Sequence, residues 1–349
     1  MSGDGPARGG HGYADRVGEA LVRYEAAAGS RPPAEALDPA RPEVRRSYRA
    51  FARAALPPIG IRPGLGEELA LRLGLKPVLR LLTDPRGVDR LAAHFARDGF
   101  ATLATSGRRR ESTVDGLVAA AEPGEDGRVL FYAGRRPDDV AEAAALDGAL
   151  FAALPDGAAA TRRLGVLLGY PSCCVEAFTS RWPVPDNATP IAAAAARSLR
   201  FDPRLDNLTL SVCHLTGWFP CRYDCAASLE VAAAVEGALA ARDRAGAARL
   251  RRFLSMPRLY ADDRRQLVLD GDVVGPGRVR LRAVHTPYAF DRDPAEAAYE
   301  WVFFADVAAP LVEGGTLTVA SDALVLETPG RAPLRRARPA ASVWLPFAG

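Results

Sequence analysis

The sequence predicts a mixed α+β protein with a helical N-terminal part, a small α/β and helical middle that carries the cysteines, and a mainly antiparallel β C-terminal part. Three observations support this prediction. Apolar residues recur at helical spacing before Phe100, the pattern then changes to short strand-like runs, and after Met256 such runs alternate with Gly, Pro and Asp turns. A chain of 349 residues is long enough for two or three domains.

Composition shifts along the chain divide it into four expected segments. The first is Gly-rich and polar and is predicted to be a disordered tail. A helical region, an α/β and helical middle domain with the cysteines, and a β-rich domain follow it. Their expected bounds are 1–12, 13–99, 100–257 and 258–349.

Beyond the Pro-rich linker at 31–42, a helical pattern runs from Glu43 to Pro57-Pro58, and two further helices follow it in the N-terminal region. Leu65, Leu69 and Leu73 share one helical face, and Gly74 is a plausible stop. Asp84-Pro85 has the residue types of a helix start, and an apolar stripe follows it.

The predicted strands lie in the middle and in the C-terminal third. Phe100–Thr105 and Arg128–Ala133 have strand length and composition, and a helix over Asp138–Leu146 makes the second strand part of a strand–helix unit. The C-terminal third is expected to form a small sheet or partial barrel. Its candidate strands are Gln266–Leu269, Val279–Val284, Val302–Phe304, Thr316–Val319, Leu324–Glu327 and Val343–Leu345.

Charge and hydropathy narrow the functional classes. The formal net charge is +3, which does not support nucleic-acid binding by itself. Lys76 is the only lysine, so nearly all positive charge is arginine. There is no apolar run long enough for a membrane span and no apolar signal-peptide core, so a cytoplasmic protein without membrane association is expected.

All five cysteines lie in one segment, which is the strongest functional feature of the sequence. Gly169–Cys174 reads GYPSCC and Pro220–Cys225 reads PCRYDC. Proline favours the first helical position, so both pairs are predicted to lie in the opening turns of helices, the second running to about Arg242. In that helix Cys221 and Cys225 would share a face. Helix N-termini favour thiolates, because free N–H groups and the macrodipole stabilise negative charge.

Four thiolates brought together would repel one another unless a cation neutralises them, so Cys173, Cys174, Cys221 and Cys225 are predicted metal ligands. Candidate centres are an iron–sulfur cluster and a tetrahedral zinc ion. The C-C and C-x3-C spacings are not the usual zinc knuckle, and adjacent cysteines rarely both reach one small ion. These two points favour an iron–sulfur cluster, [4Fe-4S], with zinc as the alternative. A thiol-redox pair and plain core cysteines are the other interpretations.

Several neighbouring residues are candidates for a role beside the cysteines. His214 is a possible further ligand or proton donor, whereas Cys213 is interpreted as an ordinary buried thiol. Glu176 and Asp224 are candidate catalytic acids or bases, but a carboxylate near a helix start also has a purely structural explanation.

The two motifs, together with Phe178, Asn207 and Ser228, resemble a prokaryotic family catalogued as domain of unknown function 483, whose signature is GYPxCC followed by HxPC-xxDC-xxS. The resemblance covers about 128–235 and implies a bacterial or archaeal protein with a site at these cysteines. It implies no reaction. Trp218 stands where the family has its histidine, so His214 would have to replace that residue, or the site here differs.

The sequence therefore predicts a metal-centre protein with redox, sulfur-transfer or Lewis-acid chemistry, acting on a small molecule or a protein partner. The competing prediction is a non-catalytic module in which zinc staples the middle domain while the β-rich third binds protein or nucleic acid. The sequence does not choose among these reactions.

Overall fold

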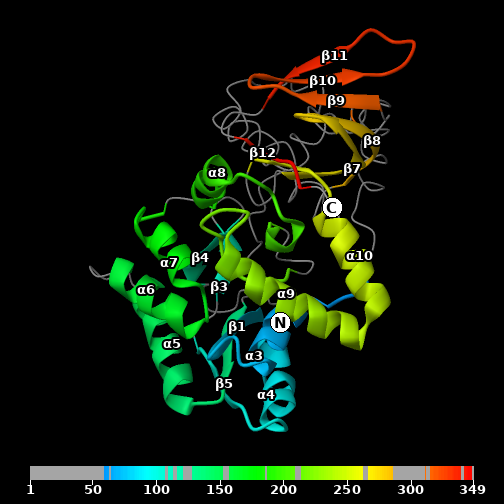
Figure 1. Cartoon of the computed structure of the whole chain (residues 1–349). Coiled ribbons are helices and arrows are strands. Elements are labelled where there is room, and N and C mark those ends of the chain that lie inside the picture. The colour runs from blue at the N-terminus through cyan, green and yellow to red at the C-terminus, as the bar shows by residue number, and fades with distance from the viewer. Residues whose placement is uncertain are drawn as a thin grey trace, which may run out of the picture. The chain divides into compact units, whose positions relative to one another are not determined.

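A computed structural model describes residues 59–62, 64–106, 109–112, 116–120, 128–151, 157–184, 187–208, 214–261, 266–285, 311, 315–338 and 342–347. Within these residues there are eight α-helices together with antiparallel sheets, so the α+β prediction is confirmed (Figure 1). The predicted tail at 1–12, the linker at 31–42, the helical pattern at 43–58, the strand at Val302–Phe304 and the thiol of Cys213 lie outside the described residues.

The chain divides into two compact units, and each is described by itself. The cysteine-bearing unit is Pro57–Asp263 with Leu345–Gly349, and the sheet unit is Arg264–Trp344 with Met1–Leu56. The domain bounds expected at 12, 99 and 257 stay predictions.

The cysteine-bearing unit holds all eight described helices. Its elements are α3 (Leu65–Arg72), β1 (Val78–Thr83), α4 (Val88–Ala96), β2 (Ala101–Ala104), β3 (Arg109–Ser112), β4 (Gly116–Ala120), β5 (Val129–Gly134), α5 (Pro137–Phe151), α6 (Gly157–Leu167), α7 (Ser172–Thr179), α8 (Ala188–Arg197), α9 (Ala226–Arg242), α10 (Arg244–Leu254) and β6 (Arg258–Tyr260), with short 3-10 helices at Pro85–Gly87 and Pro203–Leu205.

A three-stranded sheet with the order β1-β5-β2 forms the core of this unit, and both of its pairings are antiparallel. Side chains of β5 alternate between its two faces. Leu130 and Tyr132 pack with residues of α5 and α6, whereas Phe131 packs with Phe95 of α4 and Leu71 of α3. Both faces are thus covered, which explains why every residue of β5 is buried.

The sequence predicted β2, β5 and the helix that follows β5, but not β1. The β1 run, VLRLLT, is short and rich in leucine, which suits a helix as well as a strand. Its strand state follows from its pairing with β5, in which Val78 lies opposite Gly134 and Thr83 opposite Val129.

The sheet unit contains β7 (Gln266–Gly275), β8 (Arg278–His285), β9 (Gly315–Val319), β10 (Ala323–Glu327) and β11 (Leu334–Ala337), and β12 is Val343–Leu345. Within the unit the strand order is β11-β10-β9-β8-β7, part of a seven-stranded sheet. The pairings of β7 with β8 and of β9 with β8 and β10 are antiparallel, as predicted. The basic LRRA run is strand β11 and pairs with β10.

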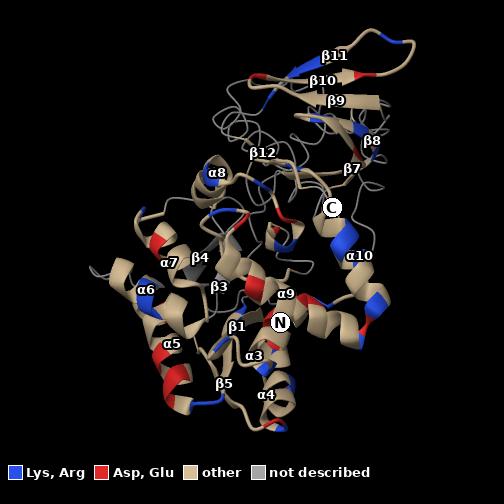
Figure 2. Cartoon of the chain, in the orientation of Figure 1, with Lys and Arg blue, Asp and Glu red and all other residues tan. Residues whose placement is uncertain are grey.

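Charged residues of both signs occur along the elements (Figure 2). Acidic residues begin α5 and arginines end α10, which places each charge at the helix end that its dipole favours. No helix of the described residues combines the length and the apolarity that crossing a bilayer requires.

Candidate metal centre

The first cysteine pair lies in the opening turn of α7. Gly169 ends the preceding helical segment with a φ of +71°, and a Cβ there would lie 2.5 Å from the carbonyl oxygen of Leu75. Only glycine fits such a turn. Pro171 then caps α7, so Cys173 and Cys174 fall in its first turn, and the backbone N–H of Cys174 donates to the Pro171 carbonyl (2.9 Å).

The second pair is not on a helix, contrary to the prediction. Helix α9 begins at Ala226 instead of near Pro220, and Cys225 is its N-cap with φ −64° and ψ 114°. Cys221 therefore lies in the turn before the helix, and the prediction that Cys221 and Cys225 share a helical face is wrong.

Hydrogen bonds to the end of α8 and the segment after it explain this difference. The backbone N–H of Tyr223 donates to the Ser198 hydroxyl (2.6 Å), and the Tyr223 carbonyl accepts from the backbone N–H of Asp202 (3.0 Å). The Asp224 carboxylate accepts from the backbone N–H of Leu199 (3.2 Å). These tertiary bonds hold the segment as a turn, closed by a bond from the Cys225 N–H to the Arg222 carbonyl (3.1 Å), where local sequence favours a helix.

The four sulfurs nevertheless meet. The Sγ atoms of Cys173 and Cys225 are 3.6 Å apart, those of Cys174 and Cys225 3.8 Å, and those of Cys173 and Cys174 4.0 Å. All four ligand atoms, Cys221 included, lie within 4.8 Å of one another. The backbone N–H of Cys221 also donates to the Cys174 sulfur (3.3 Å). The four cysteines could therefore hold a metal ion.

The adjacent residues Cys173 and Cys174 thus both direct their sulfurs into the same group. From the sequence, an iron–sulfur cluster was favoured partly because adjacent cysteines rarely both reach one small ion. Four sulfurs placed about 2.3 Å from a central Zn²⁺ at the corners of a tetrahedron would be about 3.8 Å apart, close to the three separations given above.

Burial makes it costly to ionise all four thiols without a cation. It raises the pKa of Cys174 well above the usual range, and burial with a hydrogen bond to Cys225 raises the pKa of Cys221 to about 12. Burial also raises the pKa of Cys225, but hydrogen bonds from Ser228 and Cys173 outweigh it, and the pKa falls to about 7. The four cysteines would therefore all become thiolates only when a bound cation displaces their protons.

A hydroxyl and an aromatic pair border the buried side of the group. The Ser228 Oγ lies 3.2 Å from the Cys174 sulfur and accepts a hydrogen bond from the Trp218 indole N–H (3.1 Å). The Trp218 ring packs against Tyr170, with centroids 5.1 Å apart. Trp218, the departure from the family signature, is therefore a buried neighbour of the centre instead of a ligand to it.

His214 lies elsewhere, beside a buried ion pair. Lys76 pairs with Glu67, both are buried, and the Lys76 ammonium lies 5.1 Å from the centre of the Tyr170 ring. The His214 Nε2 is 3.8 Å from Glu67 Oε1. Among the described residues the four-sulfur group does not include this histidine. Its role as a ligand or proton donor stays a prediction.

The two candidate acids both pair with arginine. The Glu176 carboxylate is largely exposed and lies 3.3 Å from Arg162. Asp224 binds Arg222, and that hydrogen bond lowers the pKa of its carboxyl to about 2. A carboxylate with so low a pKa is a weak base at neutral pH.

Sequence reasoning missed the buried ion pair and two arginines that line a cleft beside Cys174. Glu67 was not singled out, and Lys76 was noted only as the single lysine. The fact that Lys76 is the only lysine was the one feature of the sequence that could have indicated a specific role for it. Arg181 and Arg197, which line that cleft, carried no sign at all, because arginine is abundant throughout the chain.

Comparisons with known proteins found no counterpart. No protein-family model matches the chain, and neither a curated protein nor a solved structure does.

Proposed function

We propose that the chain is a metal-binding protein in which Cys173, Cys174, Cys221 and Cys225 hold one tetrahedral ion, best matched by Zn²⁺. The observation that carries this proposal is the sulfur spacing, which is 3.6–4.0 Å among Cys173, Cys174 and Cys225 and at most 4.8 Å when Cys221 is included. Tetrahedral coordination by four thiolates around one zinc requires about 3.8 Å. A cubane cluster interposes four iron atoms among its thiolates and requires wider separations.

The ion would join two segments that are far apart in the sequence. Four protein ligands complete the coordination of zinc and leave no open position, which is typical of a structural site. The ion would therefore fix the start of α7 against the turn before α9. This is the zinc-stapled alternative of the sequence, and the resemblance to domain of unknown function 483 supports the same four residues.

The deciding experiment is anaerobic purification followed by metal and sulfide analysis. We expect a colourless protein with about one zinc per chain. The matched control is Cys213→Ala, which removes the one cysteine outside the group and should keep the metal, whereas Cys225→Ala should lose it.

A brown protein with about four irons and acid-labile sulfide would instead establish the iron–sulfur prediction. Redox, sulfur-transfer or Lewis-acid chemistry at an open iron would then become the functions to test. A protein that binds neither metal would leave the cysteines as plain thiols.

A further inference from the structure

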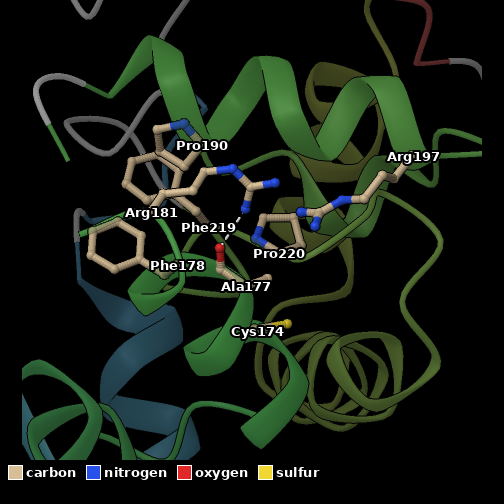
Figure 3. A pocket seen from close by; sticks show the side chains of 8 residues that line it. All are labelled: Cys174, Ala177, Phe178, Arg181, Pro190, Arg197, Phe219 and Pro220. Carbon is tan, nitrogen blue, oxygen red and sulfur yellow. Dashed lines mark hydrogen bonds between the residues drawn. The ribbon is translucent and has the colours of Figure 1, made fainter. Parts of the chain in front are cut away.

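A small cleft opens beside the sulfur group. It has a volume of about 190 Å³ including its open mouth. Figure 3 shows Cys174 at its base and the side chains of Arg181 and Arg197 extending toward each other across Pro220. Only about 10 Å³ of that space admits the centre of a water molecule, so the enclosed part holds about one water and a ligand would lie at the open mouth.

The two arginines differ from their neighbours in charge balance. Several arginines of the same unit pair with a carboxylate, among them Arg162 with Glu176, Arg204 with Asp202 and Arg222 with Asp224. Among the described residues neither Arg181 nor Arg197 has an acidic partner, and the one hydrogen bond recorded for Arg181 runs from Nη1 to the Ala177 carbonyl (2.6 Å). A guanidinium has five N–H donors, so most of the donors of this pair are available to a ligand.

One wall of the cleft is aromatic. Phe178 and Phe219 both line it, and their rings are stacked, with centroids 6.1 Å apart and planes inclined by 2°. Both side chains are only half-buried. An apolar wall next to two cationic forks matches an anion that carries an apolar part.

We propose that this cleft binds a small organic anion, whose carboxylate or phosphate group is held by Arg181 and Arg197 while its apolar part contacts Phe178 and Phe219. The guanidinium fork matches both oxyanions, because each offers two oxygens to parallel N–H donors. The inference rests on the proposed function in one respect: the anion would bind next to the thiolates of the metal centre.

Calorimetric titration of the metal-loaded protein tests this, with benzoate and phenyl phosphate as separate probes that share an aromatic ring. Tighter binding of one probe identifies the oxyanion. We expect Arg197→Gln to weaken binding about tenfold, since a charge-assisted hydrogen bond contributes about that factor. Arg181→Lys should weaken it less, because charge remains while the fork is lost. The matched control is Arg200→Gln, which removes an exposed charge outside the cleft and should leave binding within about twofold.

Three results would overturn the proposal. The first is no heat with either probe at millimolar concentration, and the second is an equal loss in the Arg197 and Arg200 variants. The third is a loss of metal in Arg197→Gln with unchanged anion binding, since the arginines would then only balance the charge of the thiolates.

Metal content measured on every sample keeps the two proposals separate. If wild-type protein purified without metal binds the anion and Arg197→Gln binds it more weakly, the result supports the cleft and removes the metal proposal. If the protein contains the metal but binds neither anion, the result supports the metal proposal and removes the cleft proposal.

Discussion

Two buried groups of ionisable side chains lie in the cysteine-bearing unit, and they differ in how their charge is balanced. The Glu67–Lys76 pair contains its own counter-charge, with His214 beside it. The four cysteines can only become negative, and the hydrogen bonds of their sulfurs join them to one another, to the Ser228 hydroxyl and to the backbone N–H of Cys221. The comparison teaches that the first group is complete within the protein, whereas the second could ionise fully only with a cation from solution.

The largest effect should come from breaking the cysteine group. Cys221→Ala removes one of four thiolates, and metal binding at such sites contributes on the order of 10 kcal/mol to folding. We expect the metal to be lost and the thermal unfolding of this unit to shift strongly to lower temperature. Metal analysis and calorimetry of this variant and of Cys213→Ala measure both effects. A variant that loses its metal but unfolds at the wild-type temperature would show that the ion is not structural.

Breaking the ion pair should have the next largest effect. Lys76→Met leaves the Glu67 carboxylate buried without its counter-charge, which costs about 3–5 kcal/mol. The double variant Glu67→Gln with Lys76→Met removes both charges and should recover much of that loss. Denaturant unfolding measures both free energies. If the double variant is as unstable as the single one, the loss comes from packing and not from an unpaired charge.

The pH dependence of stability tests the Glu67–Lys76 pair in a second way. Burial raises the pKa of Glu67, but the Lys76 charge and its neighbour His214 outweigh that effect and lower the pKa to about 2. Because the folded-state pKa lies below the unfolded value of about 4.5, the ionised carboxylate stabilises the fold above pH 4.5.

That contribution, about 3 kcal/mol, should disappear progressively as the pH falls from 4.5 toward 2. Unfolding free energies of wild type and Glu67→Gln, measured side by side across this range, test the expectation. The difference between them should shrink as the pH falls, and a constant difference would contradict it.

The smallest effect should come from Ser228, which contacts the cysteine group without belonging to it. Ser228→Ala removes the hydroxyl that accepts from Trp218 and lies against the Cys174 sulfur, at a cost of about 1–3 kcal/mol. Chelator competition should show a weaker hold on the metal. Ser180→Ala, which removes an exposed hydroxyl bonded to a helix carbonyl, should change neither property. Equal effects in the two variants would argue against a special role for Ser228.

Much of the fold could be read from local patterns. The helix over Leu65–Arg72 and the strand–helix unit of β5 and α5 follow apolar periodicity and stop signals that act within a few residues. Strand β1 could not be predicted, because its short apolar run becomes a strand only by pairing with β5, about fifty positions later.

The sequence by itself determined which atoms form the centre. Proline before each cysteine pair and the confinement of all cysteines to one segment were enough to select Cys173, Cys174, Cys221 and Cys225, because those cues are chemical and local. The geometry was decided only by tertiary structure. Hydrogen bonds with Ser198, Leu199 and Asp202 hold the second pair in a turn, and that turn brings sulfurs about fifty positions apart to within 4.8 Å. Such distances depend on contacts between segments, so no local pattern specifies them.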